Sequence, residues 1–456
     1  MYPKFAVVGH PNKGKSTIVS ALAMDDSIEI SDIPGTTTKA TEYPLKIDNK
    51  IVYSLIDTPG FQRPRQVLEF LKSKDVPATK RVEVLKEFIE LHKDNPKFRD
   101  DIELLKPIIN GAGVIYIVDA SKPYSSEFEL DMQILSYTGA ESMAILNFID
   151  NEDYSKEWKS ALKHYFKLIK RFNPLRADIN EYIDLLSAFG HLNEEWQESI
   201  KEAIKAFEKL YIMRIENSAS KITNFIFDTL SYTKVKSFEK ESEELKRSLI
   251  EEFKADIIKK ENRLYKEIKS IWDHKNLSIS LEDIGLTNIE LFSKESEEYF
   301  GLSKKELITY SATVGAAIGA GVDFALLGHT FLLGAAIGGV GGAIAGYLGF
   351  DKLAQIKILG HKFGGKKLQV GPIKNINFAF VLLNRALNFT KEIAQISHAK
   401  RENIKIEYNS LLSQKDKKEF FKLHKKIIEN KITPQLKEEY EKKIKEILLK
   451  ELKGSS

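Results

Sequence analysis

The stretch Gly9-His10-Pro11-Asn12-Lys13-Gly14-Lys15-Ser16-Thr17 decides the fold of the first half of the chain. It fits the pattern GxxxxGK[ST], with the apolar run 4–8 before it and the helix-like run 17–23 after it. A glycine-rich turn at a helix N-terminus offers backbone N–H groups and the positive end of the helix dipole to a phosphate chain. We therefore predict a strand, a phosphate-binding loop and a helix, in that order.

Within this loop, two side chains have the chemistry to hold phosphate and its counter-ion. Lys15 would reach the β- and γ-phosphates, and the Ser16 hydroxyl would bind magnesium. Glycines let the backbone approach the phosphates without a side-chain clash. The predicted nucleotide-binding residues of the loop are Gly9, Asn12, Lys13, Gly14, Lys15, Ser16 and Thr17.

Length and composition limit the class of protein. The chain has 456 residues, 43% hydrophobic and 29% charged, as in folded proteins with more than one domain. It has no cysteine, which excludes disulfides and zinc–thiolate sites and fits a reducing compartment. We see no signal peptide before the first strand and expect a cytoplasmic protein. The net charge of +4 does not by itself indicate a nucleic-acid partner.

Strand-like and helix-like runs alternate over residues 1–190, which predicts an α/β domain. The turn at 48–50 joins two of the runs into a hairpin. We expect a mainly parallel sheet in which 43–47 is the one antiparallel edge strand. The expected strands are residues 4–8, 43–47, 51–56, 113–119, 142–147 and 182–188.

A second phosphate-site motif, Asp57-Thr58-Pro59-Gly60, follows the run 51–56. A carboxylate at this strand tip can hold the magnesium shell, so we assign Asp57 to the metal site. Gly60 has a backbone amide that can contact a γ-phosphate. Two such motifs in the right order, each at a strand end, indicate a nucleoside triphosphate site.

The order of these motifs resembles the bacterial GTPase class that contains Era, TrmE and EngA. Between the two motifs lies Ser31-Asp32-Ile33-Pro34-Gly35-Thr36-Thr37-Thr38, a loop by composition. In that class the loop threonine binds magnesium and closes over the γ-phosphate, and by alignment this is Thr37. Thr36 and Thr38 remain alternatives. The resemblance implies a Ras-like P-loop fold that hydrolyses GTP to GDP with magnesium.

The resemblance also bears on catalysis. Phe61 stands where Ras-type enzymes carry the glutamine that orients the attacking water, and Gln62 is one residue off. In TrmE-like members the asparagine at the place of Asn12 binds potassium, which neutralises charge between the phosphates. This implies slow, potassium-stimulated hydrolysis, with loop capping as the alternative role for Asn12. The implied catalytic residues are Lys15, Asn12, Thr37 and Gly60.

Base recognition is implied at two further loops. Guanine-selective enzymes usually carry Asn-Lys-x-Asp, and this chain has Asn147-Phe148-Ile149-Asp150. Asp150 has the spacing to accept both guanine N–H groups, and Asn147 could brace the loop, but Phe148 replaces the lysine that stacks on the base. Ser187 and Ala188, at the end of the expected last strand, resemble the loop whose backbone touches the base.

The remaining segments read as helical. An insert at about 61–107 lies where nucleotide state could change its shape, although static packing is equally open. Residues 191–305 predict long helices with a break near 231–237. Residues 351–456 contain an apolar helix, 378–389, and end in the basic helical region 415–453.

Residues 306–350 are apolar and rich in glycine, spaced Gly315-xxx-Gly319 and Gly334-xxx-Gly338-xxx-Gly342-xxx-Gly346. Glycines four apart line one helix face and let two backbones approach closely. Three interpretations stay open: a buried helical hairpin, a hairpin at a membrane through 307–350 that would make the protein peripheral to the inner membrane, and a helix pair buried against a second subunit of a homo-oligomer.

The sequence thus predicts a GTP-binding switch protein whose nucleotide state acts on a helical C-terminal half, with membrane association of that half as one of the three open interpretations. Two alternatives remain. The first is a ribosome- or RNA-associated assembly factor, against which the weakly basic composition and the lack of a KH-type clamp argue. The second is a nucleotide-binding protein with negligible hydrolysis, for which Phe61 is the hint.

Overall fold

The computed structural model describes most of the chain. The described residues are 2–10, 13–23, 39–47, 50–174, 177, 179–238, 242–272, 290–313, 354–356, 366–395 and 410–452. The chain divides into two compact units, the first covering Met1–Tyr211 and the second covering Ile212–Ala394 with Glu402–Ser456.

A six-stranded sheet forms the centre of the first unit. Its order is β2-β3-β1-β4-β5-β6, and every neighbouring pair is parallel except β2 with β3. The predicted α/β fold with one antiparallel edge strand is confirmed. Because five strands run the same way, their carboxyl ends meet at one edge of the sheet. The strands are β1 (Lys4–Val8), β2 (Thr41–Ile47), β3 (Lys50–Asp57), β4 (Gly113–Asp119), β5 (Ser142–Asn147) and β6 (Leu168–Arg171).

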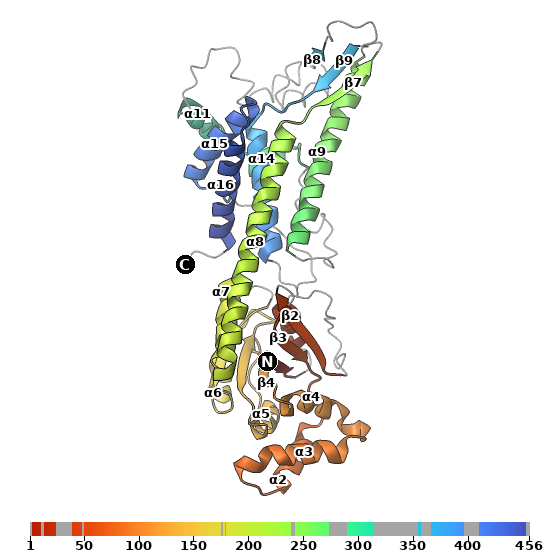
Figure 1. The fold of residues 1–456 in the computed structure, drawn as a ribbon, viewed down its shortest axis with the longest axis vertical. Coiled ribbons are helices and arrows are strands. Elements are labelled where there is room, and N and C mark those ends of the chain that lie inside the picture. The colour runs from red at the N-terminus through yellow and green to blue at the C-terminus, as the bar shows by residue number, and fades with distance from the viewer. Residues whose placement is uncertain are drawn as a thin grey trace. The chain divides into compact units, whose positions relative to one another are not determined.

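Helices cover both faces of this sheet (Figure 1). On one face, α1, α7 and the start of α8 pack on β1 and β4 through residues such as Ile18 and Leu186. On the other face, α4, α5 and α6 do so through Leu105, Met132 and Trp158. The helices are α1 (Lys15–Ala23), α2 (Pro64–Ser73), α3 (Arg81–His92), α4 (Arg99–Ile109), α5 (Phe128–Tyr137), α6 (Ser155–Leu162), α7 (Ile179–Gly190) and α8 (Gln197–Leu230), with the short 3-10 helices η1 (Ala78–Lys80), η2 (Pro96–Phe98) and η3 (Glu194–Trp196).

The insert after Phe61 is helical, as the apolar spacing predicts. It consists of α2, α3 and α4, which Figure 1 shows in orange at one end of the unit. Pro64 occupies the first turn of α2, where its fixed φ suits a helix start. Leu71 and Phe88 are fully buried in the same core as α4, so the insert packs on the domain.

The expected last strand, 182–188, is wrong, because these residues lie in α7. The buried residues Leu185, Leu186 and Phe189 recur at helical spacing and face the sheet. The last strand is instead β6, a short run of mixed polarity that pairs with β5.

The first unit extends to Tyr211, beyond the domain end expected at residue 190. The reason is the start of α8, where Ile200, Ala203 and Phe207 are buried in the core on the α1 side of the sheet. Their spacing of three and four residues gives α8 one apolar stripe in this region.

Two long helices, α8 and α9 (Glu243–Ile271), open the helical part, with the predicted break between them. The break contains a strand that the sequence did not predict, β7 (Lys234–Phe238). It pairs antiparallel with β9 (Lys366–Val370), which also pairs with β8 (Ala354–Ile356). The other helices among the described residues of the second unit are α10 (Lys294–Phe300), α11 (Lys304–Thr313), α14 (Ile376–Gln395), α15 (Gln414–Ile428) and α16 (Pro434–Leu452).

The apolar helix predicted at 378–389 is the centre of the second unit's core. Nearly every residue of α14 is buried, including the charged Arg385. The Arg385 guanidinium donates to Glu261 of α9 at 2.7 and 3.2 Å, and the Tyr265 hydroxyl donates to the same carboxylate at 2.7 Å. A buried charge needs such a partner, because an unpaired one has a large desolvation penalty.

The basic region predicted at 415–453 forms α15 and α16. Ser413 and Asp416 form a reciprocal capping box at the start of α15. The fully buried His424 of α15 lies with its Nε2 atom 2.7 Å from the hydroxyl of Tyr440 on α16. The two helices thus present an apolar side to the core and a charged side to water.

The glycine-rich segment 306–350 is described as far as Thr313, where α11 ends. The rest of the predicted hairpin lies outside the described residues. In the described ranges, no helix combines the length and apolar character required to cross a bilayer.

Candidate nucleotide site

The separately predicted motifs meet at one edge of the first unit's sheet. The loop that begins at Gly9 follows β1, the Asp57 motif ends β3, and the Asn147 motif ends β5. Since these strands are parallel, all three motifs lie at their carboxyl ends, where open α/β sheets bind ligands.

Two glycines of the loop have no room for a side chain. A Cβ atom on Gly14 would lie 2.4 Å from Asn147 Nδ2, and one on Gly9 would lie 2.4 Å from the Ile117 carbonyl oxygen. Gly14 also has a φ of +84°, which side-chain-bearing residues rarely adopt. At Gly9 and Gly14 the loop backbone therefore lies directly against neighbouring atoms, and no side chain separates them, as a phosphate cradle requires.

Lys15 is the buried cation of the site. Its side-chain ammonium donates to the His10 carbonyl at 3.0 Å. Burial lowers the pKa of Lys15, while the nearby carboxylates Asp57 and Asp131 act in the opposite direction. A phosphate beside this ammonium would raise the pKa again by stabilising the charged form, so the observed environment fits an anionic ligand.

The residues predicted to hold magnesium lie together. The Ser16 hydroxyl donates to Asp57 Oδ2 at 2.9 Å, although the two residues come from α1 and β3. Thr58 donates to the Val7 carbonyl at 2.6 Å, which fixes the end of β3 against β1. A hydroxyl and a carboxylate are the hard oxygen donors that magnesium prefers, so this donor set fits the ion.

Asn147 connects the base loop to the phosphate loop. Its side-chain amide donates to the Lys13 carbonyl at 3.1 Å, and the side chain is buried. A bracing role is what the resemblance implies for Asn147, and this hydrogen bond would serve that role. It also explains why residue 14 must be glycine, because the Asn147 amide fills the space of a Cβ.

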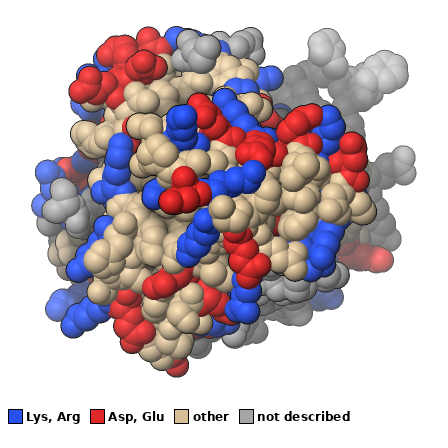
Figure 2. All heavy atoms as spheres, turned by 90° about the horizontal axis from the view of Figure 1, so that it is seen from below, with Lys and Arg blue, Asp and Glu red and all other residues tan. Residues whose placement is uncertain are grey.

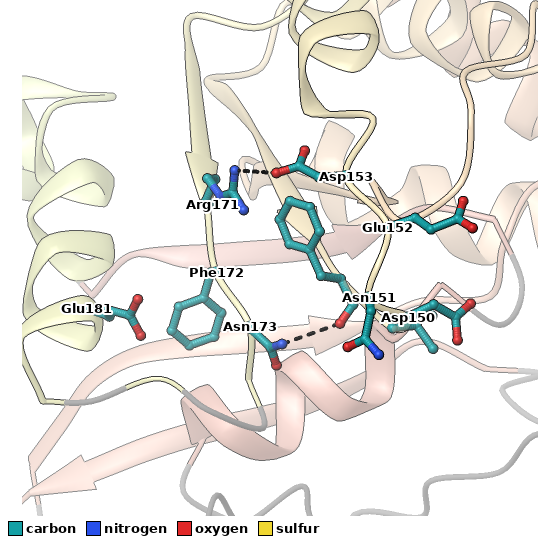
Figure 3. Close-up of a pocket in the computed structure, with 10 residues that line it drawn as sticks. Asp150, Asn151, Glu152, Asp153, Arg171, Phe172, Asn173 and Glu181 are labelled. Atoms are coloured by element: carbon teal, nitrogen blue, oxygen red, sulfur yellow. Dashed lines mark hydrogen bonds and ion pairs between the residues drawn. The ribbon is translucent and has the colours of Figure 1, made fainter.

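A cavity of about 400 Å³ adjoins this loop (Figure 3). It is lined by Phe148, Ile149, Asp150, Asn151, Glu152, Asp153, Arg171, Phe172, Asn173 and Glu181. The backbone N–H of Asp150 donates to Ser121 Oγ at 3.2 Å, and Ser121 in turn donates to Asp119 at the end of β4. Asp150 therefore lies on a braced loop and lines this cavity.

Phe148 has a cationic neighbour where the usual motif has a lysine. The Arg171 guanidinium lies 4.3 Å from the centre of the Phe148 ring, within cation–π range, and Arg171 also pairs with Asp153 at 2.9 Å. Hydrogen bonds from Ser155, followed by the Arg171 interaction, lower the pKa of Asp153 to about 2. Arg171 thus supplies a positive charge close to the site of the missing lysine.

The prediction that Ser187 and Ala188 lie on a loop at the end of the last strand is wrong. Both residues lie inside α7, with Ala188 buried, so the strand-end loop on which that prediction depended is absent there. The loop after the real last strand contains Asn173, whose side-chain amide donates to the Phe148 carbonyl at 3.3 Å. Figure 3 shows Arg171, at the end of β6, and Asn173, on the loop that follows, at the cavity.

Sequence reasoning missed Arg171, Asn173, Asp119 and Ser121. An Asn-Pro pair at 173–174 is a turn signal, and it could have indicated that a strand ends there. His10 and the buried Asp131 of α5 were also missed; the His10 Nε2 and Asp131 Oδ2 atoms lie 3.1 Å apart.

Some predicted site residues lie outside the described part of the chain. These are Asn12 and Thr37, with the neighbours Thr36 and Thr38. Gly60 is described and buried, and Phe61 after it is buried in the core between the sheet and α2–α4. Phe61 therefore packs in the protein interior and leaves the orientation of an attacking water to another group.

Two protein families match different parts of this chain. A family described as "50S ribosome-binding GTPase" matches residues 4–147, and a family described as "Domain of unknown function (DUF3482)" matches residues 159–452. The tRNA modification GTPase MnmE of Mycoplasmoides gallisepticum is 26% identical over 208 residues, which is 42% of this chain and 45% of that protein. GTPase Der of Tolumonas auensis is 24% identical over 220 residues, 48% of this chain and 38% of that protein.

Among solved structures, a variant of Aquifex aeolicus Era bound to GDP and aluminium fluoride is similar, at 16% identity, a TM-score of 0.27, and coverage of 59% of this chain and 87% of that one. The matches to MnmE and Der span less than half of the length of each of those relatives. The predicted relationship to the Era, TrmE and EngA class is confirmed for the first half of the chain. The DUF3482 family matches residues 159–452, which is more than half of this chain. The chain therefore belongs to the DUF3482 family, with a GTPase domain as its N-terminal part.

Proposed function

We propose that the chain binds GTP, hydrolyses it to GDP and phosphate, and uses the nucleotide state to switch the conformation of its helical parts. One observation carries this proposal: hydrogen bonds from Ser16 to Asp57 and from Asn147 to Lys13 join three separately predicted motifs at one sheet edge. The GTPase relationship of residues 4–147 supports it.

The proposed reaction is an in-line attack of water on the γ-phosphate. The new bond forms between the water oxygen and phosphorus, the bond to the β–γ bridging oxygen breaks, and the water protons end on phosphate and solvent. Lys15 and the loop amides would hold the phosphates, and the Gly60 amide would contact the γ-phosphate. Magnesium, held by Ser16, Thr37 and, through water, Asp57, would neutralise phosphate charge.

Potassium is part of this proposal. The Phe61 side chain is apolar and buried, so it cannot orient the attacking water. Through the TrmE-like resemblance, Asn12 would bind a potassium ion that supplies the missing positive charge between the phosphates. Intrinsic turnover is expected to be slow.

Guanine recognition is assigned to Asp150 on its braced loop. Its carboxylate would accept the two guanine N–H groups, and Phe148, with Arg171 beside it, would take the place of the lysine stem that stacks on the base. Asn173, on the loop after β6, lines the same cavity and would contribute a further contact to the base.

Phosphate release from GTP and from ATP, measured in potassium and in sodium buffers of equal ionic strength, tests the proposal. We expect turnover of GTP alone, raised by potassium, and its loss in Lys15→Ala. Lys122→Ala, which removes an exposed lysine near the site, is the matched control and should retain activity. Equal use of ATP would contradict guanine recognition, and tight GTP binding without turnover would contradict hydrolysis.

A ribosome-associated role is the second candidate, because residues 4–147 match a family described as ribosome-binding. The face seen in Figure 2 shows basic and acidic side chains interspersed, without one large basic field. Nucleic-acid surfaces are typically strongly basic. Co-sedimentation with large ribosomal subunits in the presence of GTP or GDP, at two salt concentrations, would test this role.

The membrane interpretation remains a prediction for residues 307–350, most of which lie outside the described part of the chain. Flotation with anionic liposomes, using the full chain and a deletion of 307–350, would test it. Flotation of the full chain alone would support a membrane contact. If the deletion unfolded the protein and the full chain did not float, the hairpin would instead be a buried element.

A further inference from the structure

Helix α4 contacts two segments that border the predicted phosphate motifs. The Asp101 carboxylate accepts hydrogen bonds from the backbone N–H groups of Gln62 and Arg63, at 3.0 and 3.1 Å. The Glu103 carboxylate accepts one from the backbone N–H of Ala40, at 3.3 Å. Gln62 follows Gly60 by two residues, and Ala40 is the residue before β2.

The geometry of α4 makes these two contacts separate. Residues two apart in an α-helix point about 200° away from each other around the axis. Asp101 and Glu103 therefore leave α4 on different sides, and the helix lies between the two segments that it holds. α4 itself is fixed, because Ile102, Leu105 and Ile108 are buried in the core below the sheet.

Asp101 is built for this contact. The residue is fully buried, yet both of the hydrogen bonds that Oδ1 accepts come from the backbone of the segment after Gly60. Burial raises the pKa of the Asp101 carboxyl, and the two backbone hydrogen bonds oppose that shift because they favour the ionised form. The Arg63 side chain adds a bond from Nε to the Lys97 carbonyl in η2, at 3.3 Å.

We propose that Asp101 and Glu103 are positioning residues for GTP hydrolysis, and that α4 couples the segments at Gln62–Arg63 and at Ala40 to helices α2 and α3 of the insert. The inference rests on the proposed function, since it assumes that these segments border the γ-phosphate. It assigns a role to the insert: because α4 follows α3 directly through η2, a displacement of either segment is passed to the insert. Neither residue touches the reacting atoms.

Substitution of Asp101 separates positioning from binding. Asp101→Leu removes the acceptor at similar size, and we expect kcat for GTP to fall at least 10-fold while GDP affinity changes less than 3-fold. Asp101→Asn keeps an acceptor oxygen and should recover most of the rate. Asp100→Asn, on the neighbouring half-buried acid of the same helix turn, is the matched control and should behave as wild type.

A second readout does not depend on turnover. Hydrogen exchange of the full chain should show faster exchange in peptides containing residues 62–63 for Asp101→Leu, and in peptides containing residue 40 for Glu103→Ala. Strand β4 should be unchanged in both variants. If the wild-type protein lacked GTP turnover, the exchange result would still report on the contacts, so failure of the proposed function and failure of the coupling are distinguishable.

The coupling has a specific signature. In wild type, replacing GDP by a non-hydrolysable GTP analogue should change exchange in α2 and α3, and this difference should shrink in Asp101→Leu. Wild-type kcat in Asp101→Leu, or an equal loss of kcat and GDP affinity, would overturn the positioning role. An insert whose exchange is the same with both nucleotides would overturn the coupling.

Discussion

The side-chain amide of Asn147 donates a hydrogen bond of 3.1 Å to the backbone carbonyl of Lys13, 134 positions earlier in the chain. This contact joins the base loop after β5 to the phosphate loop after β1. The hydrogen bond fixes the position of one loop relative to the other. We therefore expect its loss to change the affinity for the nucleotide.

Replacing Asn147 should weaken nucleotide binding. Asn147→Ala removes the donor and leaves the Lys13 carbonyl without this partner, for which we expect roughly a 10-fold loss of GDP affinity, about 1.4 kcal/mol. Asn147→Asp is nearly the same size but places carboxylate oxygens against the carbonyl, so its loss should be larger. Titration calorimetry with GDP would measure both, and wild-type affinity in Asn147→Asp would contradict the assignment.

Asp150→Asn should change the preferred base from guanine to xanthine. A carboxylate can only accept hydrogen bonds, which suits the two adjacent N–H groups of guanine, whereas an amide can accept one and donate one. Xanthine carries a carbonyl where guanine carries its amino group. We therefore expect roughly a 100-fold loss of GTP affinity and a gain of XTP binding. Competition between GTP and XTP for a fluorescent nucleotide would show this, and unchanged GTP affinity would remove Asp150 from the base site.

Potassium dependence should vanish with Asn12. In Asn12→Ala, turnover in potassium should fall to the level in sodium, because the carboxamide that would bind the ion is gone. Asn12→Asp retains an oxygen ligand and should keep part of the stimulation. Initial rates in both salts at matched ionic strength give the ratio, and an intact ratio in Asn12→Ala would show that potassium acts elsewhere.

The buried His424 should make the second unit sensitive to acid. Burial lowers the pKa of His424 to about 3, whereas an exposed histidine titrates near 6.5. Below pH about 6.5 the unfolded chain takes up a proton that the folded chain excludes, so stability decreases as the pH falls. The contribution between pH 7 and pH 5 is about 2 kcal/mol.

Urea unfolding at these two pH values would measure that contribution. In His424→Phe the pH-dependent loss should be smaller by about this amount, whatever the absolute stability of the variant. His191→Gln, at an exposed histidine of the first unit, should retain the wild-type dependence. An identical dependence in His424→Phe would show that His424 is not the responsible group.

Much of the first unit could be predicted from sequence, because its strands are apolar runs next to motifs. The run 113–119 is fully buried as β4, and Asp57 and Asn147 lie at strand ends as expected. The prediction failed where an apolar run served a helix: Leu185 and Leu186 belong to a helical stripe. The strand β6 has only four residues, two of them basic, so its composition does not indicate a strand. It is a strand because it pairs with β5.

The second unit shows the same limit. Its long helices follow from the absence of glycine and proline, but β7 does not, because its partner β9 lies more than a hundred residues later. In the site, the backbone contacts of Asp101 and the approach of Arg171 to Phe148 depend on tertiary placement. No local pattern in the sequence encodes either contact.

The pairing of Arg385 with Glu261 also constrains how this family can change over time. Loss of either partner alone leaves a bare charge in the core, which is strongly destabilising, whereas replacing both by apolar residues is tolerated in other proteins. A lineage can therefore abandon this pair only through a poorly folded intermediate or by two nearly simultaneous substitutions. We therefore expect positions 261 and 385 to covary among members of this family, although 124 residues separate them in the chain.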